Sequence, residues 1–198
     1  MYDEKNYDPS FVSSKAIIGK GTTIFRCSVI REDVQIGENC DIRNFVYIDR
    51  GVIIGKNVKI MDGTYMYRGI RIEDNVFIGP KVLFLNDKHP RRDKIRDLKN
   101  IEWVVKKNAS IGAGSVIQSD ITLGEYSLVG AGSVVMKDVP PFGLVYGNPA
   151  KLKTFVCRNA HPLKISTFIQ TKDNVSFKCK ICNDYIEIEK SDFLKLSV

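Results

Sequence analysis

A six-residue repeat of branched apolar residues runs through most of the chain. Every sixth residue from Val12 to Phe84 is apolar, and eleven of these thirteen residues are Val or Ile. The same period resumes at Val105 and continues to Val135. A helix needs apolar residues about every 3.6 positions, whereas β-branched residues at this spacing favour short extended segments. The repeat therefore predicts a solenoid of short strands, with an insertion between Phe84 and Val105.

Residues that tolerate a left-handed backbone stand three positions after most of these apolar anchors. They are Gly21, Asp33, Asn39, Gly51, Asn57, Gly63, Gly69, Asn75, Asn108, Gly114, Asp120 and Gly132. Such residues suit tight corners, where a Cβ clashes unless the side chain is absent or short and polar. Glycine recurs at positions 19, 37 and 55, and asparagine at 39, 57 and 75, so the longer period is three six-residue units. Each coil should therefore have three flat sides and three corners around an apolar prism.

From residue 12 to about 150 the hexapeptide repeat resembles the left-handed parallel β-helix of hexapeptide acyltransferases. The left-handed sense comes from this resemblance, because the spacing alone does not give it. Nineteen six-residue units make about six coils. We expect an all-β chain with a lead-in over residues 1–11, a β-helix over 12–150, a loop insertion over 85–104 and a small zinc-ribbon-like tail over 151–198. A solenoid that serves only as a scaffold is the alternative.

The segment from Ala109 to Lys151 resembles the C-terminal part of these acyltransferases. It contains ASIGAGSVI, YSLVGAGSVVMKDVPPF and VYGNPAK. In the family, a corner made by two Gly-Ala-Gly-Ser stretches receives the pantetheine arm of coenzyme A, so the resemblance implies acetyl-CoA as co-substrate. The coenzyme-binding residues that it implies are Ala113, Ala131, Lys137, Asn148, Pro149 and Lys151. The small residues could also be simple corner residues of the repeat.

The stretch YMYRGIRIEDNVFIGPKVLFLNDKHPRR resembles N-acetyltransferases that act on nucleotide-linked 3-amino sugars. The resemblance implies substrate binding by Tyr67, Arg68, Asp87 and Arg91, and a catalytic role for Asn86. His89 is a second catalytic candidate, because O-acetyltransferases of the hexapeptide class use a histidine base, but related amino-sugar enzymes often have an aromatic residue there. A packing role of His89 against the loop is the alternative. The insertion also carries Lys88, Arg92, Lys94 and Arg96, which could line a sugar diphosphate site or form a solvated charged loop. The chain departs from the family at Met61-Asp62-Gly63, where Gln-Asn-Asn is common, and at Lys81.

Histidine content limits the mechanism, because His89 and His161 are the only histidines. A zinc site of three histidines, as in γ-carbonic anhydrases, is therefore excluded. An amine acceptor needs no strong base, so Asn86 is assigned to hold the amine, with Asp87 beside it. The predicted function is acetyl-CoA-dependent N-acetylation of a UDP- or dTDP-linked 3-amino sugar in glycan or lipopolysaccharide biosynthesis. An O-acetyltransferase with His89 as general base, or a non-catalytic nucleotide-sugar-binding solenoid, are the alternatives.

The tail beyond the repeat contains three of the five cysteines, whereas Cys40 stands at an inward position of the repeat, as a core thiol does. A Cys3His zinc tetrahedron could be formed by Cys157, His161, Cys179 and Cys182. Some relatives carry a zinc-ribbon-like tail with a Cys-x-Cys pattern, whose second cysteine is Asn159 here. A decayed site with idle thiols is the alternative.

The net charge of +7 is concentrated in two segments, residues 86–107 and 151–198, each with an excess of four positive charges. Two local clusters suit small phosphorylated ligands, and the chain contains no known nucleic-acid-binding motif. No apolar run is long enough for a membrane-spanning helix, and the opening residues lack the apolar core of a signal peptide. We therefore expect a cytoplasmic protein that binds neither nucleic acid nor membrane. The family resemblance implies a homotrimer with the coenzyme between adjacent solenoids.

Overall fold

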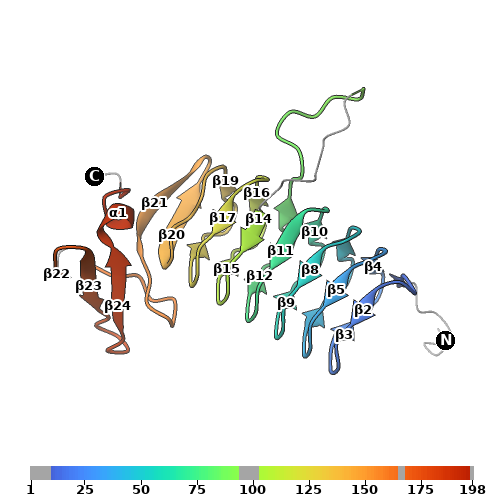
Figure 1. Cartoon of the computed structure of the whole chain (residues 1–198), viewed down its shortest axis with the longest axis horizontal. Helices are drawn as coiled ribbons and strands as arrows, with labels where there is room; N and C mark the ends of the chain where they lie inside the picture. The colour runs from blue at the N-terminus through green and yellow to red at the C-terminus, as the bar shows by residue number, and fades with distance from the viewer. Residues whose placement is uncertain (1–9, 94–102, 165–167, 197–198) are drawn as a thin grey trace, which may run out of the picture.

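The computed structural model describes residues 10–93, 103–164 and 168–196, and nearly all of its regular structure is β-strand (Figure 1). Three sheets form the walls of a long solenoid. Sheet A consists of β1 (Phe11–Val12), β4 (Val29–Ile30), β7 (Tyr47–Ile48), β10 (Tyr65–Met66), β13 (Leu83–Phe84), β16 (Val116–Ile117) and β19 (Val134–Val135). Sheet B consists of β2 (Ile17–Ile18), β5 (Gln35–Ile36), β8 (Ile53–Ile54), β11 (Ile70–Ile72), β14 (Trp103–Val105) and β17 (Thr122–Leu123). Sheet C consists of β3 (Thr23–Ile24), β6 (Asp41–Ile42), β9 (Lys59–Ile60), β12 (Phe77–Ile78), β15 (Ser110–Ile111), β18 (Leu128–Val129), β20 (Gly143–Gly147) and β21 (Ala150–Phe155).

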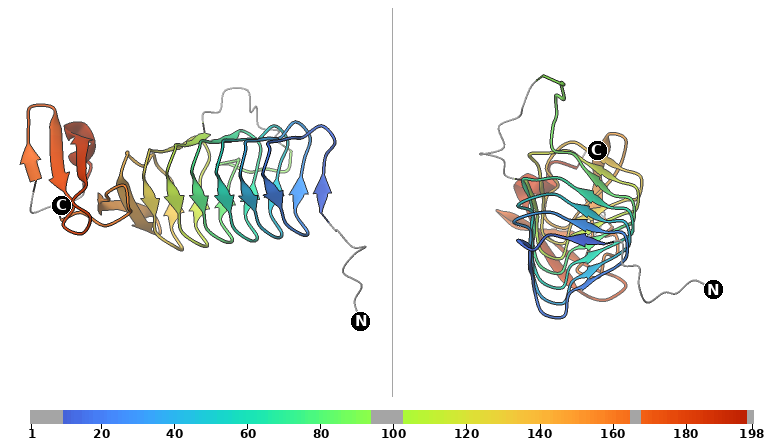
Figure 2. Two further views of the ribbon diagram at one scale, coloured as in Figure 1. Left: turned by 90° about the horizontal axis from the view of Figure 1, so that it is seen from below. Right: turned by 90° about the vertical axis from the view of Figure 1, so that its right-hand side faces the viewer.

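From β1 to β20, each strand pairs in parallel with the strand one coil away, which confirms the predicted β-helix. Val29 lies opposite Tyr47 in sheet A, and Gln35 lies opposite Ile53 in sheet B, a step of three six-residue units in both cases. Figure 2 shows the result from the side as a row of stacked strands and from the end as a three-sided prism. The main chain runs from sheet A to sheet B to sheet C and back to sheet A in every coil.

The seven strands of sheet A give about seven coils, one more than predicted. The difference lies at the C-terminal end, where the period of six is broken. Val139 lies opposite Leu123, and Val145 lies opposite Val129, so the last coil is two positions shorter than the coils before it. A search for a strict six-residue step therefore misses these two anchors.

The anchors of the repeat fill the prism, and each of them from Ile30 to Val135 is buried. All twelve residues predicted at corners have a positive φ. The structure adds corners where the sequence has larger side chains, namely Cys27, Phe45, Lys81, Tyr126 and Phe142. These residues also stand three positions after an anchor, so the register of the coil overrides their own preference for negative φ.

Two boundaries differ from the prediction. The insertion ends before Trp103, because this residue begins β14 and its buried ring lies against Phe84, with ring centroids 5.9 Å apart. The solenoid also continues past residue 150, because β21 pairs antiparallel with β20 as far as Phe155. The predicted loop residues Lys94 and Arg96 lie outside the described residues.

The tail forms a small separate sheet at the C-terminal end of the solenoid (Figure 1). Its antiparallel strands are β22 (Phe168–Gln170), β23 (Asn174–Lys178) and β24 (Tyr185–Glu189), followed by the short helix α1 (Lys190–Phe193). A second apolar core joins this sheet to the end of β21 through contacts around Phe155 and Phe177. Among the described residues there is no helix of the length and apolar character that crossing a bilayer requires.

Candidate functional site

The residues predicted to bind the acceptor lie at the corner between sheet A and sheet B. Tyr67 and Arg68 follow β10, and Asn86 and Asp87 follow β13 in the next coil. Because Tyr65 of β10 lies opposite Leu83 of β13, the four residues stand in adjacent layers of the same corner. The insertion leaves the solenoid at this point, as Figure 1 shows. The structure therefore brings the predicted acceptor residues together.

A neighbouring group that the sequence analysis did not identify supports this corner. The ring of Tyr47 lies 5.8 Å from the ring of Tyr67, measured between centroids. The Tyr47 hydroxyl donates to Oδ1 of Asp49 at 3.3 Å, and the backbone N–H of Arg68 donates to Oδ2 of the same carboxylate at 3.4 Å. Burial, followed by the charge of Asp49, raises the pKa of Tyr47. Tyr47 could have been identified from the sequence by its spacing from Tyr65, because the two tyrosines stand one coil apart.

The first part of the insertion is shaped by its own polar groups. Oδ1 of Asp87 accepts a hydrogen bond from the backbone N–H of His89 at 2.8 Å, so this carboxylate helps to form the turn. Nζ of Lys88 lies 3.5 Å from Oδ2 of Asp120, which belongs to the following coil. Arg91 is exposed and donates to the carbonyl oxygen of Pro90 at 3.1 Å. The His89 ring is exposed and has no hydrogen bond to a described residue. No described residue therefore orients the His89 ring as a base.

The two predicted coenzyme alanines lie at the opposite edge of sheet A, at the corner that leads from sheet C. Both Ala113 and Ala131 are exposed, and neither donates its backbone N–H to a described residue. Glycines one residue before them allow the coils to approach closely: a Cβ on Gly112 would lie only 2.5 Å from the amide nitrogen of Ala131. This corner therefore offers two successive unpaired N–H donors on a surface without bulky side chains.

The remaining predicted coenzyme residues lie at the C-terminal end of the solenoid. A cavity of about 680 Å³ there is lined by Lys137, Pro149 and Lys151, together with Lys195 from the tail. Asn148, which precedes Pro149 in the turn between β20 and β21, is exposed and does not line this cavity. Lys195 carried no motif and was not identified from the sequence.

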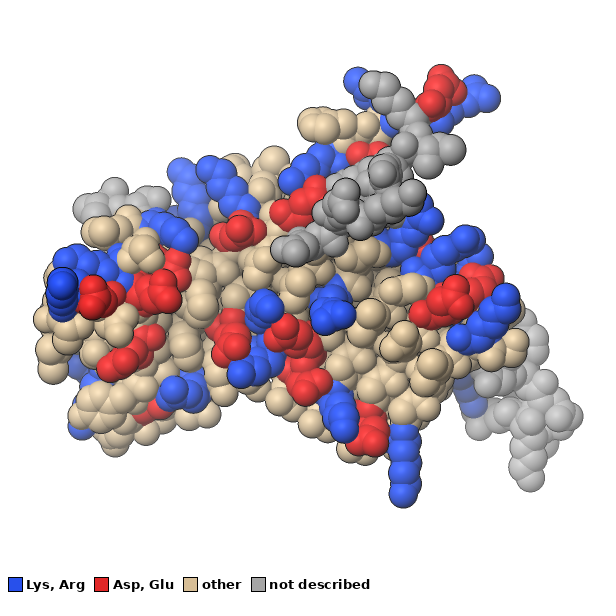
Figure 3. Space-filling view, in the orientation of Figure 1, with Lys and Arg blue, Asp and Glu red and all other residues tan. Residues whose placement is uncertain are grey.

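Sheet A lies between Lys137 and the two alanines, although the resemblance assigns all three residues to coenzyme binding. Lys137 stands at the same corner as Asn86, since Phe84, Ile117 and Val135 succeed one another in sheet A. Ala113 and Ala131 lie at the opposite edge, and within one coil Ala131 precedes Lys137 by six residues, with β19 between them. The outward row of sheet A between the two edges is apolar: Phe11, Val29, Tyr47, Tyr65, Leu83, Val116 and Val134. Elsewhere, Figure 3 shows basic and acidic side chains interspersed over one face of the molecule.

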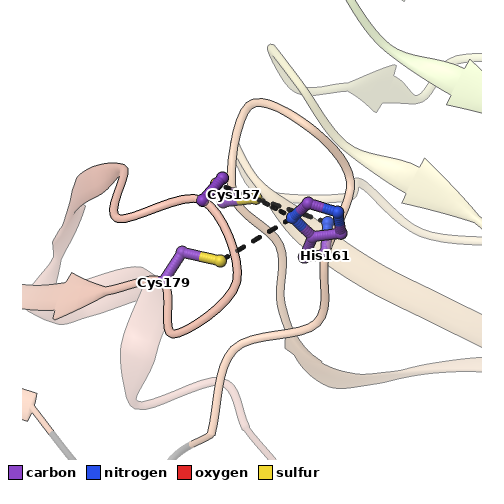
Figure 4. Close-up of side chains that lie close together, drawn as sticks. Cys157, His161 and Cys179 are labelled. Carbon is purple, nitrogen blue, oxygen red and sulfur yellow. Dashed lines mark hydrogen bonds between the residues drawn. The ribbon is translucent and has the colours of Figure 1, made fainter.

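The four predicted metal ligands converge although they come from distant parts of the tail. The ligand atoms of Cys157, His161, Cys179 and Cys182 all lie within 4.8 Å of one another. Figure 4 shows Cys157 and Cys179 directed toward the His161 ring from two different loops. A hydrogen bond from the side chain of Asn159 is the main cause that lowers the pKa of Cys182 to about 6, whereas burial raises the pKa of Cys157. All five cysteines are free thiols, and Cys40 is buried in the solenoid core as predicted.

A family model described as bacterial transferase hexapeptide (six repeats) matches residues 15–50, 51–86 and 104–137, which is more than half of the chain. The chain belongs to the bacterial transferase hexapeptide family. The predicted resemblance is thereby confirmed. The matched ranges lie on both sides of the insertion and end before the tail, so membership of the hexapeptide family concerns the solenoid.

Several known proteins are similar to this member of the hexapeptide family. The dTDP-3-amino-3,6-dideoxy-alpha-D-galactopyranose 3-N-acetyltransferase of Aneurinibacillus thermoaerophilus is 49% identical over 61 residues, which are 31% of this chain and 32% of that protein. The serine acetyltransferase of Buchnera aphidicola subsp. Schizaphis graminum is 48% identical over 54 residues, 27% of this chain and 21% of that protein. The chain thus spans a third or less of the length of these two relatives.

Among solved structures, a mutant of AntD is similar to the chain over most of its length. AntD is an N-acyltransferase from Bacillus cereus, and that structure contains dTDP and coenzyme A. It is 25% identical, with a TM-score of 0.54, over 73% of this chain and 79% of AntD. A second AntD mutant, 24% identical, has a TM-score of 0.62 over 74% of this chain and 91% of AntD, and shows the shared fold.

Proposed function

We propose that this protein transfers an acetyl group from acetyl-CoA to the amino group of a UDP- or dTDP-linked 3-amino sugar, in glycan or lipopolysaccharide biosynthesis. The observation that carries the proposal is the 49% identity to an enzyme named as a 3-N-acetyltransferase of a dTDP-linked amino sugar. The likeness to AntD, in complex with dTDP and coenzyme A, supports the same ligand classes.

The proposed reaction needs positioning more than acid–base catalysis. The amine nitrogen bonds to the carbonyl carbon of the thioester, the carbon–sulfur bond breaks, and the sulfur leaves as the coenzyme A thiolate. The proton lost by the amine passes to that thiolate or to water. Asn86 holds the amine at the corner of sheet A, with Tyr67, Arg68, Asp87 and Arg91 around the sugar nucleotide. Orientation of this kind accounts for a large part of many enzymatic rate enhancements.

The coenzyme would bind along the alanine corner. The unpaired N–H groups of Ala113 and Ala131 suit the amide carbonyls of a pantetheine arm, which need donors at a surface open to the backbone. The cations at the end of the solenoid, Lys137 and Lys151, suit the phosphates of the nucleotide part. Asn148 and Pro149 belong to the turn beside this region.

A homotrimer is part of the proposal because one chain separates the two halves of the site. The acceptor corner and the alanine corner lie on opposite edges of sheet A, and the outward row between them is apolar. In that row Phe11 and Tyr65 are 54% and 45% exposed. Burial of this row against a second copy would place the alanine corner of one chain beside the Asn86 corner of the next. The proposed substrates, acetyl-CoA and a nucleotide sugar, support a cytoplasmic location as part of the proposal.

Acetyl-CoA and a panel of UDP- and dTDP-3-amino sugars test the proposal directly, with release of free thiol as the assay. We expect turnover with one of the amino sugars and none with the corresponding hydroxyl sugar. Turnover of hydroxyl sugars alone would favour the O-acetyltransferase, a candidate that the similarity to serine acetyltransferase supports. Absence of thiol release with tight binding of a nucleotide sugar would favour a non-catalytic solenoid.

Two substitutions in the same loop separate the amine mechanism from the hydroxyl mechanism. Asn86→Ala should lower kcat/KM by about 100-fold, because the amine loses a positioning contact. His89→Ala should change it little, whereas loss of a general base costs about 100- to 10,000-fold. In His89→Ala, kcat/KM should still rise with pH as the substrate amine loses its proton. Loss of activity in His89→Ala with normal activity in Asn86→Ala would contradict the proposed mechanism.

A further inference from the structure

We propose that the tail binds one structural zinc ion through the sulfurs of Cys157, Cys179 and Cys182 and through Nδ1 of His161. This site lies outside the solenoid and outside the region that the family model matches, so it does not depend on the proposed acetyl transfer. Of the two alternatives that the sequence left open, a metal site and idle thiols, this proposal favours the metal site.

Three of the six distances among the four ligand atoms match those of a tetrahedral zinc site. Bonds of about 2.3 Å to sulfur and about 2.0 Å to nitrogen place two sulfurs about 3.8 Å apart and a sulfur and a nitrogen about 3.5 Å apart. Sγ of Cys157 lies 3.6 Å from Sγ of Cys182 and 3.4 Å from Nδ1 of His161. Sγ of Cys179 lies 3.8 Å from the same nitrogen. The other separations are at most 4.8 Å, so small side-chain movements bring all four atoms around one ion.

Two similar turns deliver the ligands in pairs. The backbone N–H of Ala160 donates to the carbonyl of Cys157 at 2.8 Å, and that of Asn183 donates to the carbonyl of Cys179 at 2.9 Å. Ala160 and Asn183 both have a positive φ, of 61° and 59°. Each turn thus brings a second ligand, at position i+4 or i+3, beside the first.

Hydrogen bonds around the cluster suit thiolate ligands. The backbone N–H of His161 donates to Sγ of Cys157 at 3.4 Å. Arg158 holds the two turns together, because its guanidinium donates to Oδ1 of Asp184 at 2.7 Å and to the carbonyl of Tyr185 at 3.2 Å. Such outer contacts orient the ligands of metal sites. They hold the two turns in the orientation that brings the four ligands together.

A disulfide explains the cluster less well than a metal does. A disulfide between Cys157 and Cys182 would use two of the four converging groups and leave Cys179 and His161 without a role. Cys157 and Cys179 are almost completely buried, at 1% and 2% exposure. Three sulfurs and one imidazole are the ligands that zinc prefers, and four protein ligands are typical of structural rather than catalytic sites.

The metal would fasten the tail to the solenoid. Cys157 follows β21, which is paired with the last coil, whereas Cys179 follows β23 of the small sheet. The apolar core of the tail is small: Phe155, Cys157, Leu163, Val175, Phe177, Cys179, Ile186 and Ile188. Domains with so few core residues commonly need a metal or disulfides to fold, and the binding energy of the metal then becomes folding energy.

The test uses the full chain, purified without chelators and without a histidine tag. Elemental analysis should find about one zinc per chain, and Co²⁺ exchanged into the wild-type protein should show the absorption of a tetrahedral thiolate site. Cys182→Ser should lose the zinc, whereas the control Cys27→Ser, at a half-buried cysteine of the solenoid, should keep it. In hydrogen exchange, metal removal should expose the amides of β23 and β24 while those of β4 to β18 stay protected.

Three results would overturn the proposal. The first is metal-free protein, grown with ample zinc, whose tail amides are as protected as those of metal-loaded protein. The second is a Cys157–Cys182 disulfide found by mass spectrometry in protein kept under reducing conditions. The third is full zinc content in Cys182→Ser. If this variant fails to fold, cobalt exchange into the wild-type chain decides the question on its own.

Discussion

Replacement of Gly112 by alanine should destabilise the solenoid because two coils touch there through backbone alone. A Cβ on residue 112 would lie 2.5 Å from the amide nitrogen of Ala131, 2.8 Å from its Cα and 2.8 Å from the carbonyl carbon of Gly130. Backbone atoms cannot rotate away as a side chain can. The coils must therefore move apart in Gly112→Ala.

The size of the effect follows from these contacts. An ordinary contact needs about 3.5 Å, so the coils would have to separate locally by about 1 Å. This movement stretches two hydrogen bonds of 2.8 Å, from Gly112 to Val129 and from Gly132 to Ala113. Overpacking costs about 1–3 kcal/mol, and two weakened hydrogen bonds add about 1–2 kcal/mol. For a chain of this length, 1 kcal/mol lowers Tm by about 2–4 °C, so Gly112→Ala should lower it by about 10 °C.

Gly114→Ala is the matched control, two residues away in the same turn. A Cβ there meets no atom within 4 Å, but its φ of +67° imposes left-handed strain of about 1–2 kcal/mol. Thermal unfolding followed by circular dichroism should therefore give the order wild type, Gly114→Ala, Gly112→Ala. A Gly112→Ala protein that melts at or above the Tm of Gly114→Ala would refute the argument from coil contact.

Three further substitutions test the corners and the tail. Ala131→Phe should raise the KM for acetyl-CoA by more than about 10-fold, because the exposed side chain would block the pantetheine path. It should lower Tm far less than Gly112→Ala does. Unchanged acetyl-CoA kinetics would exclude this path. Asp120→Asn removes the charge that faces Lys88 and should lower kcat/KM for the acceptor about two- to fivefold, as expected for an exposed ion pair, without changing the KM for acetyl-CoA. Arg158→Ala should speed hydrogen exchange in β23 and β24 about fivefold, since a half-exposed ion pair contributes about 1 kcal/mol, and equal rates would show that Arg158 does not hold the tail.

The sequence determined the solenoid because most contacts between its coils recur at a fixed spacing. A residue such as Ile48 meets its neighbours one coil before and one coil after, at a constant interval that can be counted in the sequence. The corners were equally predictable where glycine or asparagine marks a positive φ. Phe45 and Tyr126 occupy the same kind of corner without such a marker, and only the register of the coil reveals them.

The candidate sites were predictable in part. Tyr67, Arg68, Asn86 and Asp87 were expected together, and they share one corner because they stand near the same phase of the repeat. We did not expect Lys137 to lie across sheet A from the alanine corner. A motif that is continuous in sequence passes through all three sheets within one coil, so its residues come to lie at different corners of the prism. The cavity that joins Lys137 to Lys195 depends on how the tail folds back.

The tertiary structure alone decided what happens where the repeat stops. The last coil is shorter than the others, and β21 turns back along β20 instead of continuing to the next side of the prism. Neither event has a periodic signal, because each depends on contacts made once. The sequence supplied four candidate metal ligands between Cys157 and Cys182, but their convergence within 4.8 Å required β21 and the sheet of β22 to β24 to pack on a common core. Contacts that repeat can be counted along a chain, whereas contacts that occur once are fixed by the packing of the whole fold.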